Sequence, residues 1–147
     1  MKRLIYILPL LLAIVLQSCQ NDGHIGDIFG TWRVESYTRD GAEMEFGPTT
    51  FSFQNNIVDC VLLIDDYGTS WNRFGTWKRE GNDFELNFTH SDNGTSQGSG
   101  IYEAPGWLGM TSAEVMRMTV SLKGDKMSWT WHDPAGALCI YRLHKTW

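Results

Sequence analysis

The sequence predicts an all-β fold, an eight-stranded antiparallel up-and-down β-barrel. Short segments in which apolar and polar residues alternate follow one another along the chain, as expected for half-buried strands. Residue pairs that favour tight turns, such as Asp40-Gly41 and Asn55-Asn56, separate most of these segments. No segment has the convincing periodicity of an amphipathic helix. A meander of eight strands closes naturally into a barrel with room for one small ligand.

The strands expected from this alternation follow in chain order. They cover residues 31–38, 49–54, 57–64, 69–78, 84–88, 115–122, 127–131 and 137–145. In the first strand, Trp32, Val34 and Ser36 share one face, and Tyr37 lies on the other. Residues 57–64 are apolar on both faces apart from Asp59, so the inward face of this strand stays open.

Two segments interrupt the pattern. Residues 42–48 carry Met44 and Phe46 before a Gly-Pro pair, and we expect a loop over a barrel mouth. Residues 90–114 begin with a glycine- and serine-rich stretch and continue with apolar residues that include Trp107 and Leu108. A loop of this length is unusual in a compact domain, so it either contains a short strand or helix or acts as an apolar lid.

The N-terminus has the features of an export segment. Lys2 and Arg3 precede a short apolar run, and Leu16-Gln17-Ser18-Cys19 resembles the lipobox of bacterial lipoproteins. The resemblance implies cleavage before Cys19 and acylation of its thiol with chains such as palmitate. Residues 1–18 would then be a lipoprotein signal peptide, residues 19–27 a lipidated tether and residues 28–147 the barrel domain. The alternatives are an ordinary signal peptide with a coincidental cysteine, or an uncleaved anchor.

Lipidation would place the protein in the cell envelope as an outer-membrane lipoprotein, on the periplasmic or the surface face. Without residues 1–18 the chain has 129 residues and a net charge of −7. An acidic domain with no basic run is a poor candidate for binding nucleic acid or an anionic lipid surface. The acyl chains would attach the protein to the membrane, while any protein partner remains unknown.

The cysteines and histidines indicate no metal site and no cofactor. Cys60 and Cys139 both lie in apolar strand-like segments, which slightly favours two buried, unpaired thiols over a disulfide. The histidines lack the spacing of metal ligands. They are His24, His90, His132 and His144.

Gly30 and Trp32 on the first strand, Arg142 on the last and the eight-strand meander resemble the lipocalins. The Gly-Thr-Trp phrase recurs with Gly75 and Trp77, as in the lipocalin-like lipoproteins of Bacteroidetes-type bacteria. The resemblance implies that Arg142 packs over Trp32 as a structural signature. The chain lacks the Thr-Asp-Tyr motif and C-terminal helix of the secreted lipocalins.

The motifs favour binding over catalysis, and we expect no enzyme. Asp65-Asp66 and His132-Asp133 fit turns, and no nucleophile or metalloprotease motif is present. The expected ligand is a small apolar or amphipathic molecule inside the barrel. The residues expected to line its site are Trp71, Arg73, Trp77, Phe84, Phe88, Trp129 and Trp131.

Arg73 shares its strand face with Trp77 and should point inward unless Gly75 marks a bulge. An inward guanidinium needs a partner, which could be a ligand carboxylate or phosphate, or an acid such as Asp59. Alternatively, Arg73 lies near the rim of the barrel in water. The alternative function is a structural or interaction lipoprotein whose side chains fill the barrel and whose surface docks onto another envelope protein. An interior pocket of roughly 300 Å³ or more would favour the ligand-binding function.

Overall fold

The computed structural model describes residues 26–89 and 102–147. The proposed signal peptide, Cys19 and the first part of the long loop lie outside the described residues. Within these two ranges, nine strands and one short 3₁₀ helix follow in chain order. They are β1 (Gly30–Arg39), β2 (Ala42–Glu43), β3 (Thr49–Gln54), β4 (Ile57–Leu63), β5 (Ser70–Glu80), β6 (Asp83–Asn87), η1 (Gly106–Leu108), β7 (Met116–Lys123), β8 (Lys126–His132) and β9 (Leu138–Lys145).

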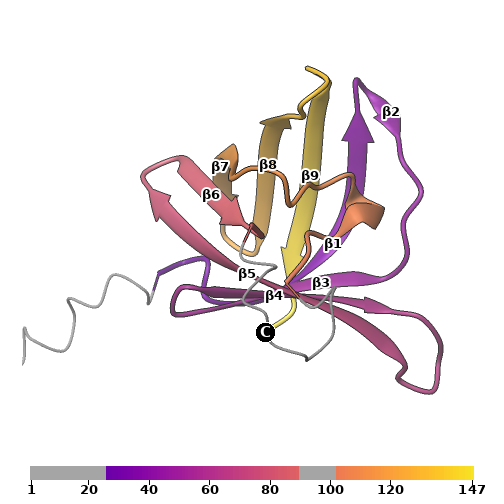
Figure 1. Cartoon of the computed structure of the whole chain (residues 1–147). Helices are drawn as coiled ribbons and strands as arrows, with labels where there is room; N and C mark the ends of the chain where they lie inside the picture. The colour runs from indigo at the N-terminus through magenta and orange to yellow at the C-terminus, as the bar shows by residue number, and fades with distance from the viewer. Residues whose placement is uncertain (1–25, 90–101) are drawn as a thin grey trace, which may run out of the picture.

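The strands form a closed antiparallel barrel. Each strand from β3 to β9 pairs with the next along the chain, and β1 pairs with both β3 and β9, which closes the sheet. In Figure 1, β7, β8, β9 and β1 run side by side, and β3, β4 and β5 cross beneath them. The eight barrel strands confirm the predicted fold class. The two-residue β2 extends the hairpin after β1 and was not expected.

A β-bulge in β1 changes which residues face inward. The register of β1 against β9 shifts between Val34 and Ser36. Trp32 and Val34 are buried before the shift and Tyr37 is buried after it, whereas Ser36 is half-buried. The expectation that Ser36 faces inward and Tyr37 outward was therefore wrong, because the extra residue of a bulge reverses the alternation.

Aromatic rings fill the barrel interior. Phe53 packs edge-on against Trp77 and Phe84, with ring centroids 5.3 Å and 5.9 Å away. Trp129 packs against Phe84 at 5.4 Å and edge-on against Phe51 at 5.0 Å. These five side chains are at most 8% exposed. Burial of aromatic rings supplies much of the stability of a core this size.

Residues 102–114 cross one end of the barrel, which we call the mouth, and we call these residues the covering segment. Figure 1 shows them running from η1 across β9 and β8 to β7. Leu108 is fully buried, and its carbonyl accepts a 2.8 Å hydrogen bond from the Tyr141 hydroxyl. Gly109 adopts φ 68°, and a Cβ atom there would collide with the Tyr37 hydroxyl. The sequence predicted either a short strand or helix, or an apolar lid, in the long loop. Its described part contains a short helix and also covers the mouth.

Candidate functional site

Five of the seven residues predicted to line a ligand site belong to the packed core. Their exposure is 8% or less, and they contact one another or the neighbouring core rings. They are Trp77, Phe84, Phe88, Trp129 and Trp131. The tight approach of Gly75 to Phe88 shows how densely this part is filled, because a Cβ on Gly75 would lie 2.7 Å from a Phe88 ring carbon. The rings expected to form ligand walls instead contact other side chains.

Trp71 and Arg73 lie at the mouth, on the inward face of β5. Cys60, which is buried, pairs with Arg73, and Leu62 pairs with Trp71. The register between β4 and β5 runs unbroken from Ile57 to Leu63, so Gly75 marks no bulge. The inward orientation expected for Arg73 is thereby confirmed, while Trp71 is 53% exposed because β5 extends past the rim of the barrel.

The covering segment supplies a third residue to this group, Trp107. The Arg73 guanidinium carbon lies 5.6 Å from the centre of the Trp107 ring, within the range of a cation–π contact. The Trp71 and Trp107 rings are 6.4 Å apart and tilted by 50°. Strand β5 and helix η1, which are far apart along the chain, therefore both contribute a tryptophan close to the Arg73 guanidinium.

The side chain of Thr49, the first residue of β3, holds Trp107 in place. Its indole N–H donates a 3.0 Å hydrogen bond to the Thr49 hydroxyl oxygen, and that hydroxyl in turn donates to the Gly47 carbonyl at 2.8 Å. Thr49 is fully buried. These two hydrogen bonds fix the orientation of the indole. We call Thr49, Leu62, Trp71, Arg73 and Trp107 the mouth site.

Arg73 has few partners among the residues that the structure describes. Its guanidinium donates one 3.1 Å hydrogen bond, to the carbonyl of the adjacent Asn72. None of the ion pairs found in residues 26–89 and 102–147 includes Arg73. Asp59, the acid considered as its partner, pairs in register with Phe74 and therefore lies on the opposite face of the sheet. Several N–H groups of the guanidinium remain available for an anion.

The thiols are buried and unpaired, as expected. Cys60 and Cys139 are both free cysteines. Burial raises the pKa of the Cys60 thiol well above its usual value and also raises that of Cys139. Tyr37 places its hydroxyl 3.9 Å from the Cys139 sulfur.

The cation over the signature tryptophan is Lys145, and the expectation for Arg142 was wrong. Trp32 pairs with Lys145 across β1 and β9, and the ammonium nitrogen lies 5.3 Å from the Trp32 ring centre. Arg142 pairs with Ser36 and Ser128, and its side chain is exposed on the outer face. The Trp32 indole N–H donates to the Ile28 carbonyl at 2.7 Å, which closes the end opposite the mouth.

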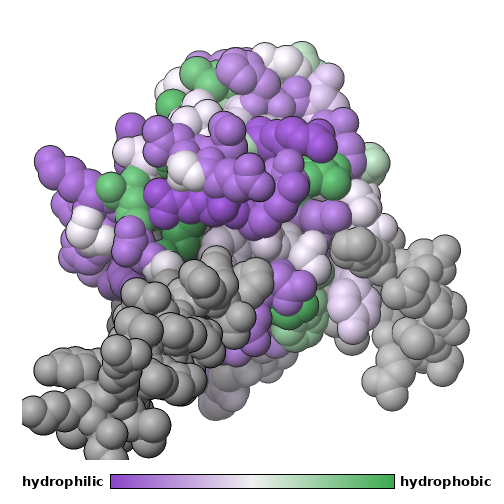
Figure 2. All heavy atoms as spheres, turned by 90° about the vertical axis from the view of Figure 1, so that its left-hand side faces the viewer, coloured by the Kyte–Doolittle hydropathy of each residue, from purple (hydrophilic) through white to green (hydrophobic). Residues whose placement is uncertain are grey.

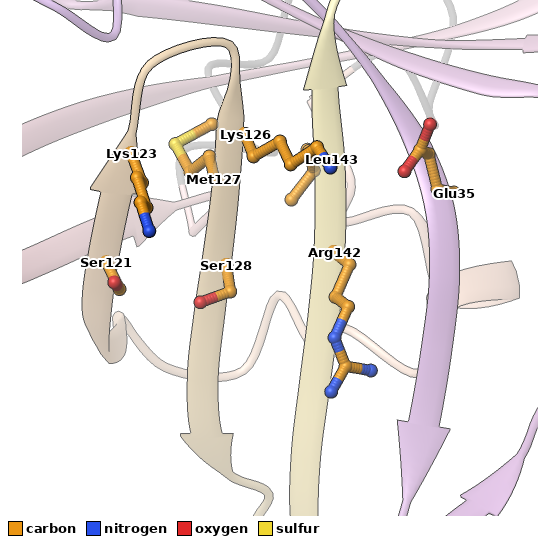
Figure 3. Close-up of a pocket in the computed structure, with 8 residues that line it drawn as sticks. All are labelled: Glu35, Ser121, Lys123, Lys126, Met127, Ser128, Arg142 and Leu143. Carbon is orange, nitrogen blue, oxygen red and sulfur yellow. The ribbon is translucent and has the colours of Figure 1, made fainter.

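Several pockets lined by described residues lie on the outer surface. One has about 410 Å³ and lies beside β5 and β6, around Thr76, Glu85 and Asn87. Another, of about 310 Å³, lies along β7, β8 and β9 (Figure 3). Figure 2 shows a predominantly hydrophilic face with small apolar patches. Within the described ranges we find no cluster of three potential metal ligands, and no helix there is long and apolar enough to span a membrane.

Comparisons with known proteins agree on the fold. No family model and no curated protein sequence matches the chain. A lipocalin-like protein from Bacteroides uniformis superimposes with a TM-score of 0.54 at 16% identity, covering 80% of this chain and 98% of its own. An uncharacterised protein from Bacteroides eggerthii gives a TM-score of 0.56 at 15% identity, with 79% and 98% covered. The chain therefore has the lipocalin-like barrel fold that it shares with these Bacteroides proteins.

Proposed function

We propose that this protein is a non-enzymatic binding protein of the bacterial cell envelope that holds a small amphipathic molecule with an anionic head at its mouth site. The observation that carries the proposal is the position of Arg73. Its guanidinium stacks over Trp107 on the inward face of the mouth and donates to one neighbouring carbonyl. A cation in partly apolar surroundings favours an anionic partner, and a guanidinium binds carboxylate or phosphate in bidentate geometry.

The ligand lies at the mouth rather than deep inside the barrel in this proposal. The interior is occupied by Trp129, Phe51 and Phe53, each with 0% exposure, and by their buried neighbours. The half-exposed Trp71 ring offers a flat apolar surface next to the Arg73 cation. A carboxylate would contact the guanidinium while an aromatic or acyl group covers the Trp71 face.

The absence of catalysis is part of the proposal. A cysteine acts as a nucleophile through its thiolate, and a raised pKa keeps the thiol protonated at neutral pH. Burial raises the pKa of both Cys60 and Cys139. The Asp65 carboxylate accepts two 3.0 Å hydrogen bonds from the backbone N–H groups of Tyr67 and Thr69, which supports a structural role in the turn.

The anchor is the acylated Cys19 inferred from the lipobox resemblance. It would hold the barrel at the outer membrane, on either the periplasmic or the surface face. Membrane attachment through several acyl chains is stable, since each buried methylene contributes about 0.8 kcal/mol.

Tryptophan fluorescence titration tests the mouth site. We expect fatty acids or aromatic acids to bind more tightly than their methyl esters. Arg73→Met keeps the apolar stem and should remove this preference, with a loss of about 10-fold to 150-fold in affinity for the acids, equivalent to about 1.5–3 kcal/mol for a charged hydrogen bond. Arg79→Met is the matched control on the same strand, since Arg79 donates to the Gly81 carbonyl at the opposite end.

Equal affinity for acids and esters in the wild type would refute the role of Arg73. Binding of neither class would favour the second candidate, an interaction lipoprotein with a filled barrel that docks onto another envelope protein. That candidate is supported by three exposed apolar side chains at the end of β4 and in the following turn. They are Leu63, Ile64 and Tyr67, which are 48%, 47% and 97% exposed.

A further inference from the structure

A basic face lies on the outside of the barrel, at the end opposite the mouth. Strand pairing places Arg33 opposite His144, His144 opposite Lys126, and Lys126 opposite Lys123. These four residues therefore form one row across β1, β9, β8 and β7. The adjacent row contains Arg142. We call Arg33, Lys123, Lys126, Arg142 and His144 the basic face.

Hydroxyl groups flank Arg142 in its row. Ser36 pairs with Arg142 across β1 and β9, Ser128 pairs with it across β8 and β9, and Ser121 pairs with Ser128. Part of both rows lines one groove with a volume of about 310 Å³. Figure 3 shows Lys123 and Lys126 of the first row, and Ser121, Ser128 and Arg142 of the second, on neighbouring strands. Guanidinium, ammonium and serine hydroxyl groups are the donors that proteins use for phosphate oxygens.

Most of the positive charge on this face has no ion-pair partner in residues 26–89 and 102–147. Among the ion pairs of the described residues, only His144 on this face takes part, with Asp125 at 2.8 Å. Two acids oppose an anion there. Glu35 lines the groove, and Asp125 lies in the turn between Lys123 and Lys126, beside His144. Lys123 and Lys126 are directly paired, and like charges opposite each other destabilise a sheet. A bound anion would remove that repulsion.

The basic face shares its end of the barrel with the start of the described chain. The Lys145 ammonium donates to the Asp27 carbonyl at 3.3 Å, and the Lys145 backbone N–H donates to the Asp125 carbonyl at 2.8 Å. The chain from Cys19 to Gly26 can span at most roughly 25 Å when fully extended. An anchor on Cys19 would therefore keep this end of the barrel close to a bilayer.

We infer that the basic face docks onto the phosphate headgroups of the membrane that carries the anchor. The position of the face relative to the membrane rests on the proposed anchor, whereas its affinity for phosphate does not. Docking would orient the barrel with its mouth site directed away from the bilayer. The net charge of the whole chain gave the opposite expectation. Acidic residues outnumber basic ones over the chain, but the reverse holds on this face, where Glu35 and Asp125 lie among five basic residues.

Vesicle co-sedimentation tests the inference without the anchor. The protein used starts at residue 19 and carries Cys19→Ser, which removes acylation and leaves every described residue in place. We expect phosphatidylglycerol in phosphatidylcholine vesicles to increase binding, and added salt to weaken it. Combining Lys123→Gln, Lys126→Gln and Arg142→Gln should reduce binding by about fivefold for each cation removed, because a cation near an anionic surface contributes about 1 kcal/mol.

The matched control removes the same number of positive charges from another part of the barrel. Lys78→Gln, Arg79→Gln and Arg117→Gln remove three cations of β5 and β7, two of which pair with Glu85. Circular dichroism should show an intact fold for both triple variants. Equal losses in the two triple variants, or no preference of the wild type for phosphatidylglycerol, would overturn the inference. Binding of inorganic phosphate without vesicle binding would also overturn it, and would assign the groove to a soluble anion.

Discussion

A double-mutant cycle between Trp32 and Lys145 tests how the closed end of the barrel is held. Trp32 has 0% exposure, and its ring faces the Lys145 ammonium at 5.3 Å. Trp32→Ala should lower the free energy of unfolding by about 3–5 kcal/mol, the usual cost of truncating a buried tryptophan. Trp32→Leu keeps part of the apolar volume and should cost less, so it suits the cycle better. It also removes the hydrogen bond to the Ile28 carbonyl.

Lys145→Met removes the charge and keeps the stem that packs on the ring. The cation–π contact predicts an interaction free energy of about 0.5–1 kcal/mol between Trp32→Leu and Lys145→Met. Arg142→Met lies on the outer face and should be additive with Trp32→Leu to within about 0.3 kcal/mol. Urea unfolding followed by circular dichroism measures each free energy. Coupling of Trp32 to Arg142 instead of Lys145 would refute this account of the closed end.

Three further predictions address the covering segment, a buried acid and the anchor. Gly109→Ala should destabilise the protein by about 1–3 kcal/mol in thermal unfolding, because Gly109 has a positive φ and a Cβ there would collide with the Tyr37 hydroxyl. Gly124→Ala is the control and should cost less, since Gly124 also has a positive φ, of 61°, but open space around it. Equal costs would contradict the contact between Gly109 and Tyr37. Burial raises the pKa of Asp59, so the folded chain holds this proton more tightly and stability falls as pH rises above about 3.9 towards the folded pKa. Asp59→Asn should therefore stabilise most at neutral pH, and a gain of the same size in acid would exclude this cause. Cys19→Ala should leave an unprocessed precursor without fatty-acid label, and equal labelling of variant and wild type would reject the lipobox.

The sequence was sufficient to predict most strands because apolar and polar residues alternate clearly in all of them except residues 57–64. Phe51, Met118 and Trp129 all lie on the faces that alternation assigned to the core. Alternation failed at the bulge of β1, because the extra residue leaves no mark in the pattern of Val34 to Tyr37. The same alternation contradicts the expectation for Arg142. Its neighbours Tyr141 and Leu143 are buried, so Arg142 lies on the outer face of the last strand.

The candidate sites were harder to predict because strand pairing and a loop determine them. Trp107 belongs to a segment without strand or helix periodicity, so its position over Arg73 was not predictable from the pattern. The basic face combines residues that are far apart along the chain, from Arg33 to His144, and its register depends on the closure of β1 onto β9. The net charge of the whole chain does not reveal a local basic face of this kind.

The tryptophan indole N–H resonances in an NMR titration test the central claim most directly. The protein has seven tryptophans, and those at the mouth differ in exposure from those of the core. Addition of a fatty or aromatic carboxylate should shift the resonances of Trp71 and Trp107, and should leave those of Trp32 and Trp129 unchanged. Arg73→Met should abolish the shifts. Shifts centred on Trp129 with Trp107 unaffected would place the ligand inside the barrel and contradict binding at the mouth.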